Sequence, residues 1–82
     1  MSKMQTRKGM IFESELAKYM KLRGINSKEK LRMLTTVGSH QTILSYFDNP
    51  EKIPMGKMQE IMSALKVPKE ERVRIVTMLL DE

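Results

Sequence analysis

The chain has 82 residues, a net charge of +5 and no cysteine. A chain of this length forms one domain with a thin core, so there is little room for a deep substrate pocket. Disulfide bonds and thiolate metal sites are excluded, and no apolar run approaches the ~20 residues of a membrane span. We therefore expect a soluble protein of the cytoplasm.

The positive charge is concentrated in the first third of the chain. Residues 1–32 carry nine basic and three acidic side chains, residues 33–66 carry three of each, and residues 67–82 carry three basic and four acidic. A cationic segment favours a polyanionic partner. Lysine-rich helix faces are also often simply solvated, so charge alone leaves both interpretations open.

The first nine residues lack apolar periodicity, so we expect a flexible basic arm over residues 1–9 and a folded domain over residues 10–82. Such an arm would hold DNA phosphates through its cations. These cations are Lys3, Arg7 and Lys8.

The first helix is predicted over residues 11–23, where apolar side chains recur at the spacing of one helix face. They are Phe12, Leu16 and Met20. Gly24 is expected to end this helix in the left-handed conformation that glycine adopts without strain.

A second and a third helix are predicted on either side of a tight turn. Asn26 would cap the second helix as part of an Asn-x-x-Glu capping box with Glu29. β-Branched residues followed by Gly38 favour the turn, and Ser39 would cap the third helix. The side chains of these helices that we expect in the core are Leu31, Leu34, Ile43 and Phe47.

Two further helices complete the expected fold. Residues 55–65 have the most regular apolar periodicity, and Pro68 suits the first turn of a fifth helix. The expected core positions of the fourth helix are Met58, Ile61, Met62 and Leu65. We find no convincing strand in the sequence, and the predicted fold class is therefore all-α, a compact bundle of five helices.

Polar side chains at the exposed start of the third helix suit contact with base edges in a major groove. Gln41 can pair with adenine through two hydrogen bonds, and Leu44 can meet a thymine methyl group. The side chains expected to contact bases are His40, Gln41, Leu44 and Ser45. Phosphate contacts are expected at the helix starts, where backbone N–H groups attract anions. They are Asn26, Ser27, Lys28, Lys30, Ser39 and Thr42.

From Leu16 to Val67 the chain resembles the lambda-repressor/Cro type of helix-turn-helix regulator. The segments that carry the resemblance are LAKYMKLRGINSKEKLRML, GSHQTILSYF and IPMGKMQEIMSALKV, in that order. The resemblance implies a lambda-repressor-like bundle in which helices 2 and 3 form the helix-turn-helix, and dimers that bind paired half-sites on duplex DNA. It also implies base contacts by His40, Gln41 and Ser45, and phosphate contacts by Ser27, Thr42 and Lys52.

The chain departs from this pattern at two places. Residues 35–38 make the turn about two residues longer than usual. In the middle of helix 2, where a small residue is common, the chain has Arg32 or Met33. Both departures bear on the angle between the two helices.

The last helix is apolar nearly all round after Arg74. One stripe of it can cover the core, and the other, either Ile75 and Leu79 or Val76 and Leu80, would be exposed in a monomer. Self-association would bury this stripe, so we expect a homodimer. The alternatives are a small core that needs every apolar residue of the helix, and a monomer that dimerises only on DNA. The candidate interface residues are Ile75, Val76, Leu79 and Leu80.

The sequence thus favours a regulator of phage, plasmid or bacterial type that binds double-stranded DNA in the cytoplasm or nucleoid. We expect a repressor, because occluding a promoter needs no further surface. His40 is the only histidine and has no nucleophile partner, which argues against an enzyme and a metal site. No cofactor, small-molecule ligand or membrane is suggested. A protein-interaction module that uses the last helix and an RNA or single-strand binder remain open alternatives.

Overall fold

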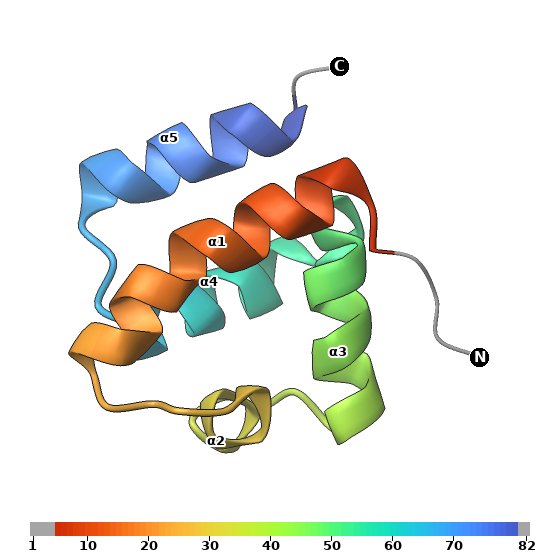
Figure 1. Cartoon of the computed structure of the whole chain (residues 1–82), viewed down its shortest axis with the longest axis vertical. Helices are drawn as coiled ribbons and strands as arrows, with labels where there is room; N and C mark the ends of the chain where they lie inside the picture. The colour runs from red at the N-terminus through yellow and green to blue at the C-terminus, as the bar shows by residue number, and fades with distance from the viewer. Residues whose placement is uncertain (1–4, 81–82) are drawn as a thin grey trace.

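Five α-helices and one short 3-10 helix form from residues 5–80, the part of the chain that the computed structural model describes (Figure 1). Their bounds are α1 Arg7–Leu22, α2 Lys28–Met33, α3 His40–Asp48, η1 Pro50–Lys52, α4 Met55–Ala64 and α5 Lys69–Leu80. These residues contain no strand, which confirms the predicted all-α class. None of the described helices is both long enough and apolar enough to cross a membrane.

One hydrophobic core joins all five helices. In Figure 1, α1 crosses the middle of the molecule with α5 alongside it and α3 at its N-terminal end, while α2 is seen end-on below. The rings of Phe12 and Phe47 lie at the centre of the contact between α1 and α3, with 5.4 Å between their centroids. The most completely buried apolar side chains are Phe12, Leu16, Leu31, Ile43, Phe47, Ile61, Met62, Leu65 and Ile75. The core positions predicted for the third and fourth helices are confirmed.

The start of α1 corrects the predicted arm. Thr6 caps the helix by accepting a hydrogen bond from the Gly9 N–H at 2.9 Å, and its hydroxyl donates to the Asp48 carbonyl oxygen at 2.7 Å. Arg7 and Lys8 therefore belong to the first helical turn, and the prediction of a flexible segment was wrong for residues 5–9. The cause is a polar contact with the end of α3, which apolar periodicity does not register. Lys3 lies outside the described residues.

Gly9 allows α1 and α3 to approach closely. A Cβ atom added at this position would lie 2.6 Å from the Phe47 carbonyl oxygen, and closer still to that of Asp48. Backbone oxygens cannot move aside as a flexible side chain can, so this position requires glycine. The contact fixes the C-terminal end of α3 against α1.

α2 is shorter than expected and starts one residue later. Ser27, not Asn26, is its cap, and the Ser27 hydroxyl accepts from the Lys30 N–H at 3.1 Å. The helix ends at Met33, so Leu34 lies beyond the last helical residue and is 58% exposed, while Leu31 is fully buried. The predictions of an Asn26 cap and of Leu34 in the core were therefore wrong.

The helices α1 and α4 end in the same way, with a residue of positive φ just after the helix. Gly24 has φ +70°, as predicted, and the following Ile25 N–H donates to the Met20 carbonyl oxygen at 2.9 Å. Lys66 has φ +54°, and the Val67 N–H donates to the Met62 carbonyl oxygen at 3.0 Å. Both are Schellman motifs, and each is followed by a buried aliphatic side chain.

α5 buries one of its two apolar stripes. Ile75 and Leu79 are 0% and 4% exposed and belong to the core, so of the two stripes that the sequence left open for a dimer interface, this one is corrected to the core. Val76 is half-buried, and Val73 and Leu80 are exposed. An ion pair between Arg74 and Glu15, 2.8 Å long, holds α5 alongside α1. The stripe that remains outside is therefore Val73, Val76 and Leu80.

Candidate nucleic-acid interface

The outer side of α3 carries polar side chains, and its inner side packs tightly into the core. Its inner residues Ile43 and Phe47 are fully buried, so the helix cannot rotate without disrupting the core. The solvent-facing side of α3, which we call the α3 outer face, carries the exposed Gln41 and Ser45 and the half-buried Thr42, and its edge towards α2 carries the exposed His40 and the half-buried Leu44. Of the four residues predicted to contact bases, Gln41, Leu44 and Ser45 line one hollow, and His40 lies at the edge of the face.

The cap of α3 is formed as predicted. The Ser39 hydroxyl accepts from the Thr42 N–H at 3.2 Å and lies 2.9 Å from the Thr42 hydroxyl. Both residues line a shallow hollow of about 820 Å³ along α3, together with Lys28, Gln41, Leu44, Ser45 and Asp48. Predicted base-contacting and phosphate-contacting side chains therefore share one surface.

A chain of hydrogen bonds ties α2 to the start of α3. Arg32 donates to both carboxylate oxygens of Glu29, at 2.9 and 2.6 Å, and to the Val37 carbonyl oxygen at 3.1 Å. The same Glu29 carboxylate lies 3.0 Å from Nδ1 of His40, the first residue of α3. Arg32 thus connects α2 to the linker directly and to α3 through Glu29.

The linker of residues 34–39 is also held from the side of α4. The Thr36 backbone N–H donates to Glu60 Oε1 at 2.6 Å, and Lys57 Nζ donates to the Thr36 hydroxyl at 2.5 Å. Val37, only 3% exposed, anchors the linker in the core. The longer turn therefore does not leave α3 loosely attached.

Hydrogen bonds from charged and neutral groups lower the pKa of three acidic side chains in this region. Hydrogen bonds from Arg32, and then from His40, lower the pKa of Glu29 from its ordinary value of 4.5 to about 2. The backbone N–H and hydroxyl of Thr36 lower the pKa of Glu60. Hydrogen bonds from Gln5, and then from Lys28, lower the pKa of Glu13.

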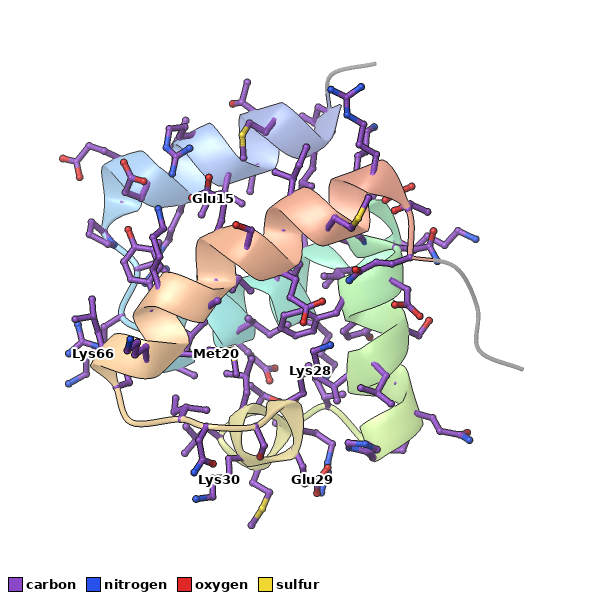
Figure 2. The ribbon with its side chains drawn as sticks, in the orientation of Figure 1. Glu15, Met20, Lys28, Glu29, Lys30 and Lys66 are labelled. Atoms are coloured by element: carbon purple, nitrogen blue, oxygen red, sulfur yellow. The ribbon has the colours of Figure 1, made fainter. Side chains whose placement is uncertain are left out.

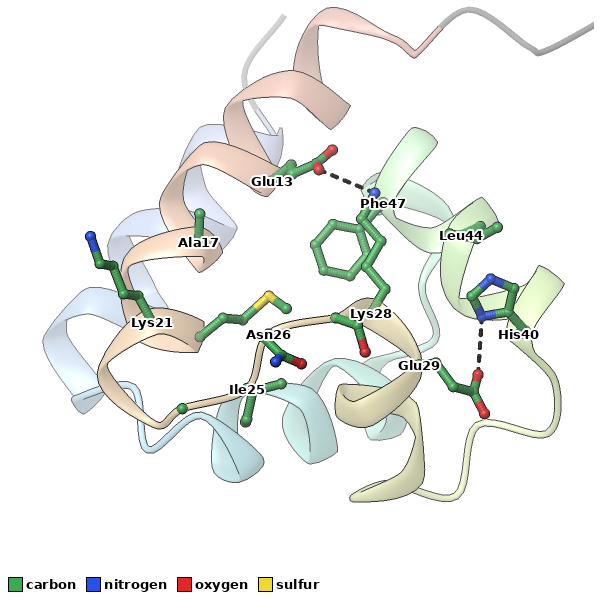
Figure 3. A pocket seen from close by; sticks show the side chains of 13 residues that line it. Glu13, Ala17, Lys21, Ile25, Asn26, Lys28, Glu29, His40, Leu44 and Phe47 are labelled. Atoms are coloured by element: carbon green, nitrogen blue, oxygen red, sulfur yellow. Dashed lines mark hydrogen bonds and ion pairs between the residues drawn. The ribbon is translucent and has the colours of Figure 1, made fainter.

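The predicted phosphate-binding cations divide into two kinds. Lys28 points inward: its Nζ lies 3.1 Å from Glu13 and 4.9 Å from the centre of the Phe47 ring (Figure 3). Lys30 points away from the helices (Figure 2), and Lys52 is exposed on η1. Lys30 and Lys52 are therefore available to an anion, whereas Lys28 is engaged within the protein.

The remaining predicted phosphate contacts surround the α3 outer face. Asn26 and Ser27 are exposed before α2 and line a groove of about 770 Å³ between α1, α2 and α3 (Figure 3). Arg7 is exposed and Lys8 half-buried in the first turn of α1, which contacts the C-terminal end of α3. Arg7, Lys8 and Lys52 thus lie near the C-terminal end of α3, and Lys30 lies on α2.

Sequence reasoning missed Glu29 and Arg32 as part of this region. The two residues are three apart on a helix and could be recognised as an ion pair. Their contact with His40 spans eleven residues and a change of helix, and no local pattern predicts it. Glu29 was assigned instead to a capping box.

A second surface, which is apolar, lies between α4 and α5. We call it the α4–α5 face and define it by Met55, Met58, Val73, Val76 and Leu80. It includes a hollow of about 640 Å³ and an adjoining one of about 140 Å³, and both are lined by Met55, Met58 and Val76. Val76 and Leu80, predicted for a dimer interface, lie on this face.

Within residues 5–80 no group of three or more histidine, aspartate or glutamate side chains is placed to hold a metal ion. Comparison of the chain with family models, with curated proteins and with solved structures gave no match. The assignment of function therefore depends on the surfaces themselves.

Proposed function

We propose that this protein is a sequence-specific regulator that binds double-stranded DNA, with α2 and α3 acting as a helix-turn-helix. In this proposal α3 enters the major groove and the α3 outer face contacts base edges. The observation that carries the proposal is the exposure of His40, Gln41 and Ser45 on a helix whose other side is locked into the core. Side chains that read bases must be both accessible and rigidly placed.

The cations around α3 support the same proposal. Arg7 and Lys52 are exposed near its C-terminal end, Lys30 is exposed on α2, and all three would neutralise phosphates of the bound duplex. The N-terminus of α2, with Ser27 as its cap, offers further N–H groups to a phosphate. If six to ten phosphates are contacted, affinity falls by roughly 10³–10⁵ between 50 and 200 mM salt.

We propose further that the protein acts as a homodimer through the α4–α5 face and represses transcription by occluding a promoter. A two-fold dimer would present two copies of α3 to half-sites about 34 Å apart. Exposed apolar patches of this kind commonly mark protein interfaces. The same face also suits a second candidate function, a module that binds an apolar partner protein.

Selection of bound duplexes from a random pool tests the proposal. We expect enrichment of a short sequence, present as an inverted repeat if the protein binds as a dimer. Selection from single-stranded DNA and RNA pools in parallel is the control. Enrichment only from the unpaired pools would favour a single-strand binder. No enrichment from any pool would favour the protein-interaction module.

A further inference from the structure

The ring of His40 is held by one nitrogen at the edge of the α3 outer face. Its Nδ1 lies 3.0 Å from Glu29 Oε1 (Figure 3). The carboxylate cannot turn away, because Arg32 holds both of its oxygens, at 2.9 and 2.6 Å. The His40 side chain is still 54% exposed, so the rest of the ring faces solvent.

This contact determines what the other ring nitrogen can do. An ionised carboxylate only accepts hydrogen bonds, so Nδ1 of His40 must carry a hydrogen atom. In the neutral imidazole the second nitrogen, Nε2, then has no hydrogen and is an acceptor. In the imidazolium form Nε2 is a donor. The same ring therefore offers opposite hydrogen-bonding character in its two protonation states.

Three of the other charged groups near this ring, Arg32, Glu13 and Lys28, are themselves paired. On α2, Arg32 is bound to Glu29 and to the Val37 carbonyl oxygen. On α1 and α2, Glu13 and Lys28 form an ion pair. The charged side chains that line the groove shared with His40 are Glu13, Lys21, Lys28 and Glu29. Of the described residues, Glu29 is the one with an ion pair to the His40 ring.

We propose that Glu29 is a positioning residue that fixes which base His40 selects. With neutral imidazole, Nε2 accepts a hydrogen bond from an amino-bearing base edge, adenine N6 or cytosine N4. With imidazolium, Nε2 donates to an acceptor on the base edge, which is guanine N7 or O6, adenine N7 or thymine O4, and cytosine offers no such acceptor. The base preferred at one position of the half-site therefore changes with pH. This inference rests on the proposed function, because it assumes that α3 lies in a major groove.

The first test uses the protein without DNA. The nitrogen chemical shifts of the imidazole report which nitrogen carries the hydrogen, and we expect Nδ1–H to predominate at about pH 8. In Glu29→Gln the amide can either donate or accept, so the population of the Nε2–H form rises. An unaltered tautomer in Glu29→Gln, or an Nε2–H form in the unsubstituted protein, would overturn the inference whatever the protein binds. The same spectra show whether the variant is folded.

The second test repeats the duplex selection at about pH 5.5 and pH 8. At one position of each half-site we expect the preference for cytosine over guanine or thymine to fall by about fivefold as the pH falls, which is the value of one net hydrogen bond. Glu29→Gln should reduce the shift to less than about twofold, and His40→Ala should abolish it, while the other positions keep their preference. Duplex binding with the same preference at both pH values would overturn the inference but leave the proposed function intact. Loss of all duplex binding would overturn both.

Discussion

The α3 outer face and the α4–α5 face differ in how their exposed side chains are held. At the edge of the α3 outer face, His40 is placed by hydrogen bonds that run from Arg32 to Glu29 and on to His40. On the α4–α5 face, Met55 and Leu80 are exposed to 69% and 75%. Exposed polar groups are stable in water, whereas contiguous apolar groups gain free energy when a partner covers them. The two faces therefore suit partners of different chemistry, a polyanion for the first and an apolar surface for the second.

The largest loss of stability should come from disrupting the close contact between α1 and the C-terminal end of α3. Gly9→Ala drives a Cβ atom into the Phe47 and Asp48 carbonyl oxygens at the end of α3. We expect a loss of about 2–3 kcal/mol in the free energy of unfolding, measured by urea denaturation. The matched control is Gly56→Ala on α4, where the added Cβ meets open space. It should raise stability by about 0.5–1 kcal/mol, and equal losses in both variants would contradict the close approach.

Gln41→Ala separates the functions of the two faces. If Gln41 pairs with adenine, its removal costs about 1–3 kcal/mol of binding free energy to a single half-site duplex. The same substitution on α4, Gln59→Ala, is the control and should leave half-site affinity unchanged. Fluorescence anisotropy at constant salt measures both. A Gln41→Ala protein with full affinity and unchanged sequence preference would argue against contact by the α3 outer face.

Val73→Ser tests the α4–α5 face. Val73 is 60% exposed, so its replacement should change the stability of the folded monomer by less than about 0.5 kcal/mol. We expect it to shift the monomer–dimer equilibrium towards monomer in sedimentation experiments. Ser14→Ala, at an exposed position of α1, is a control that should not shift this equilibrium. Self-association that is unaffected by Val73→Ser would remove this face from the dimer proposal.

Substitutions at the two Schellman motifs should change the free energy of unfolding by smaller amounts and in opposite directions. Lys66 carries a side chain at φ +54°, a conformation that is strained for all residues except glycine. Lys66→Gly should stabilise the protein by about 0.5–1 kcal/mol, since the strain is relieved but backbone entropy is lost. Gly24→Ala, at φ +70°, should destabilise it by about 1 kcal/mol. Thermal denaturation of both variants checks the pair, and changes of the same sign would contradict this account.

Acid should weaken the hydrogen-bonded region gradually. The folded pKa of Glu29, about 2, is lower than its ordinary value of 4.5, so the folded protein binds fewer protons at this site than the unfolded chain. The stabilisation is complete above about pH 4.5 and is lost as the pH falls towards 2. Melting temperatures at intervals between pH 5.5 and 2.5 should fall less steeply for Glu29→Gln. Gln59→Ala, which removes no ionisable group, is the control and should leave the slope unchanged.

The sequence predicted those features that depend on neighbouring residues. Apolar spacing located the core positions of α3 and α4, and Gly24 marked the end of α1. Where two adjacent residues could both cap a helix, as Asn26 and Ser27 could, the sequence did not distinguish them. The start of α1 was missed because Thr6 is held by the distant Asp48 carbonyl.

In the candidate site, too, the sequence predicted the features set by neighbouring residues and missed those set by distant ones. The exposure of Gln41 and Ser45 followed from helical geometry once Ile43 and Phe47 were placed inside. The inward orientation of Lys28 depends on Glu13 and Phe47, which belong to two other helices. For α5 the sequence showed two apolar stripes and could not choose between them, because the choice depends on how the helix packs against α1.

Mapping backbone amide chemical shifts during titration with a short duplex tests the central claim most directly. The account predicts the largest changes at residues 39–45, and little change at Met55, Val73 and Leu80. Changes confined to the α4–α5 face, or no change at any duplex concentration, would contradict it.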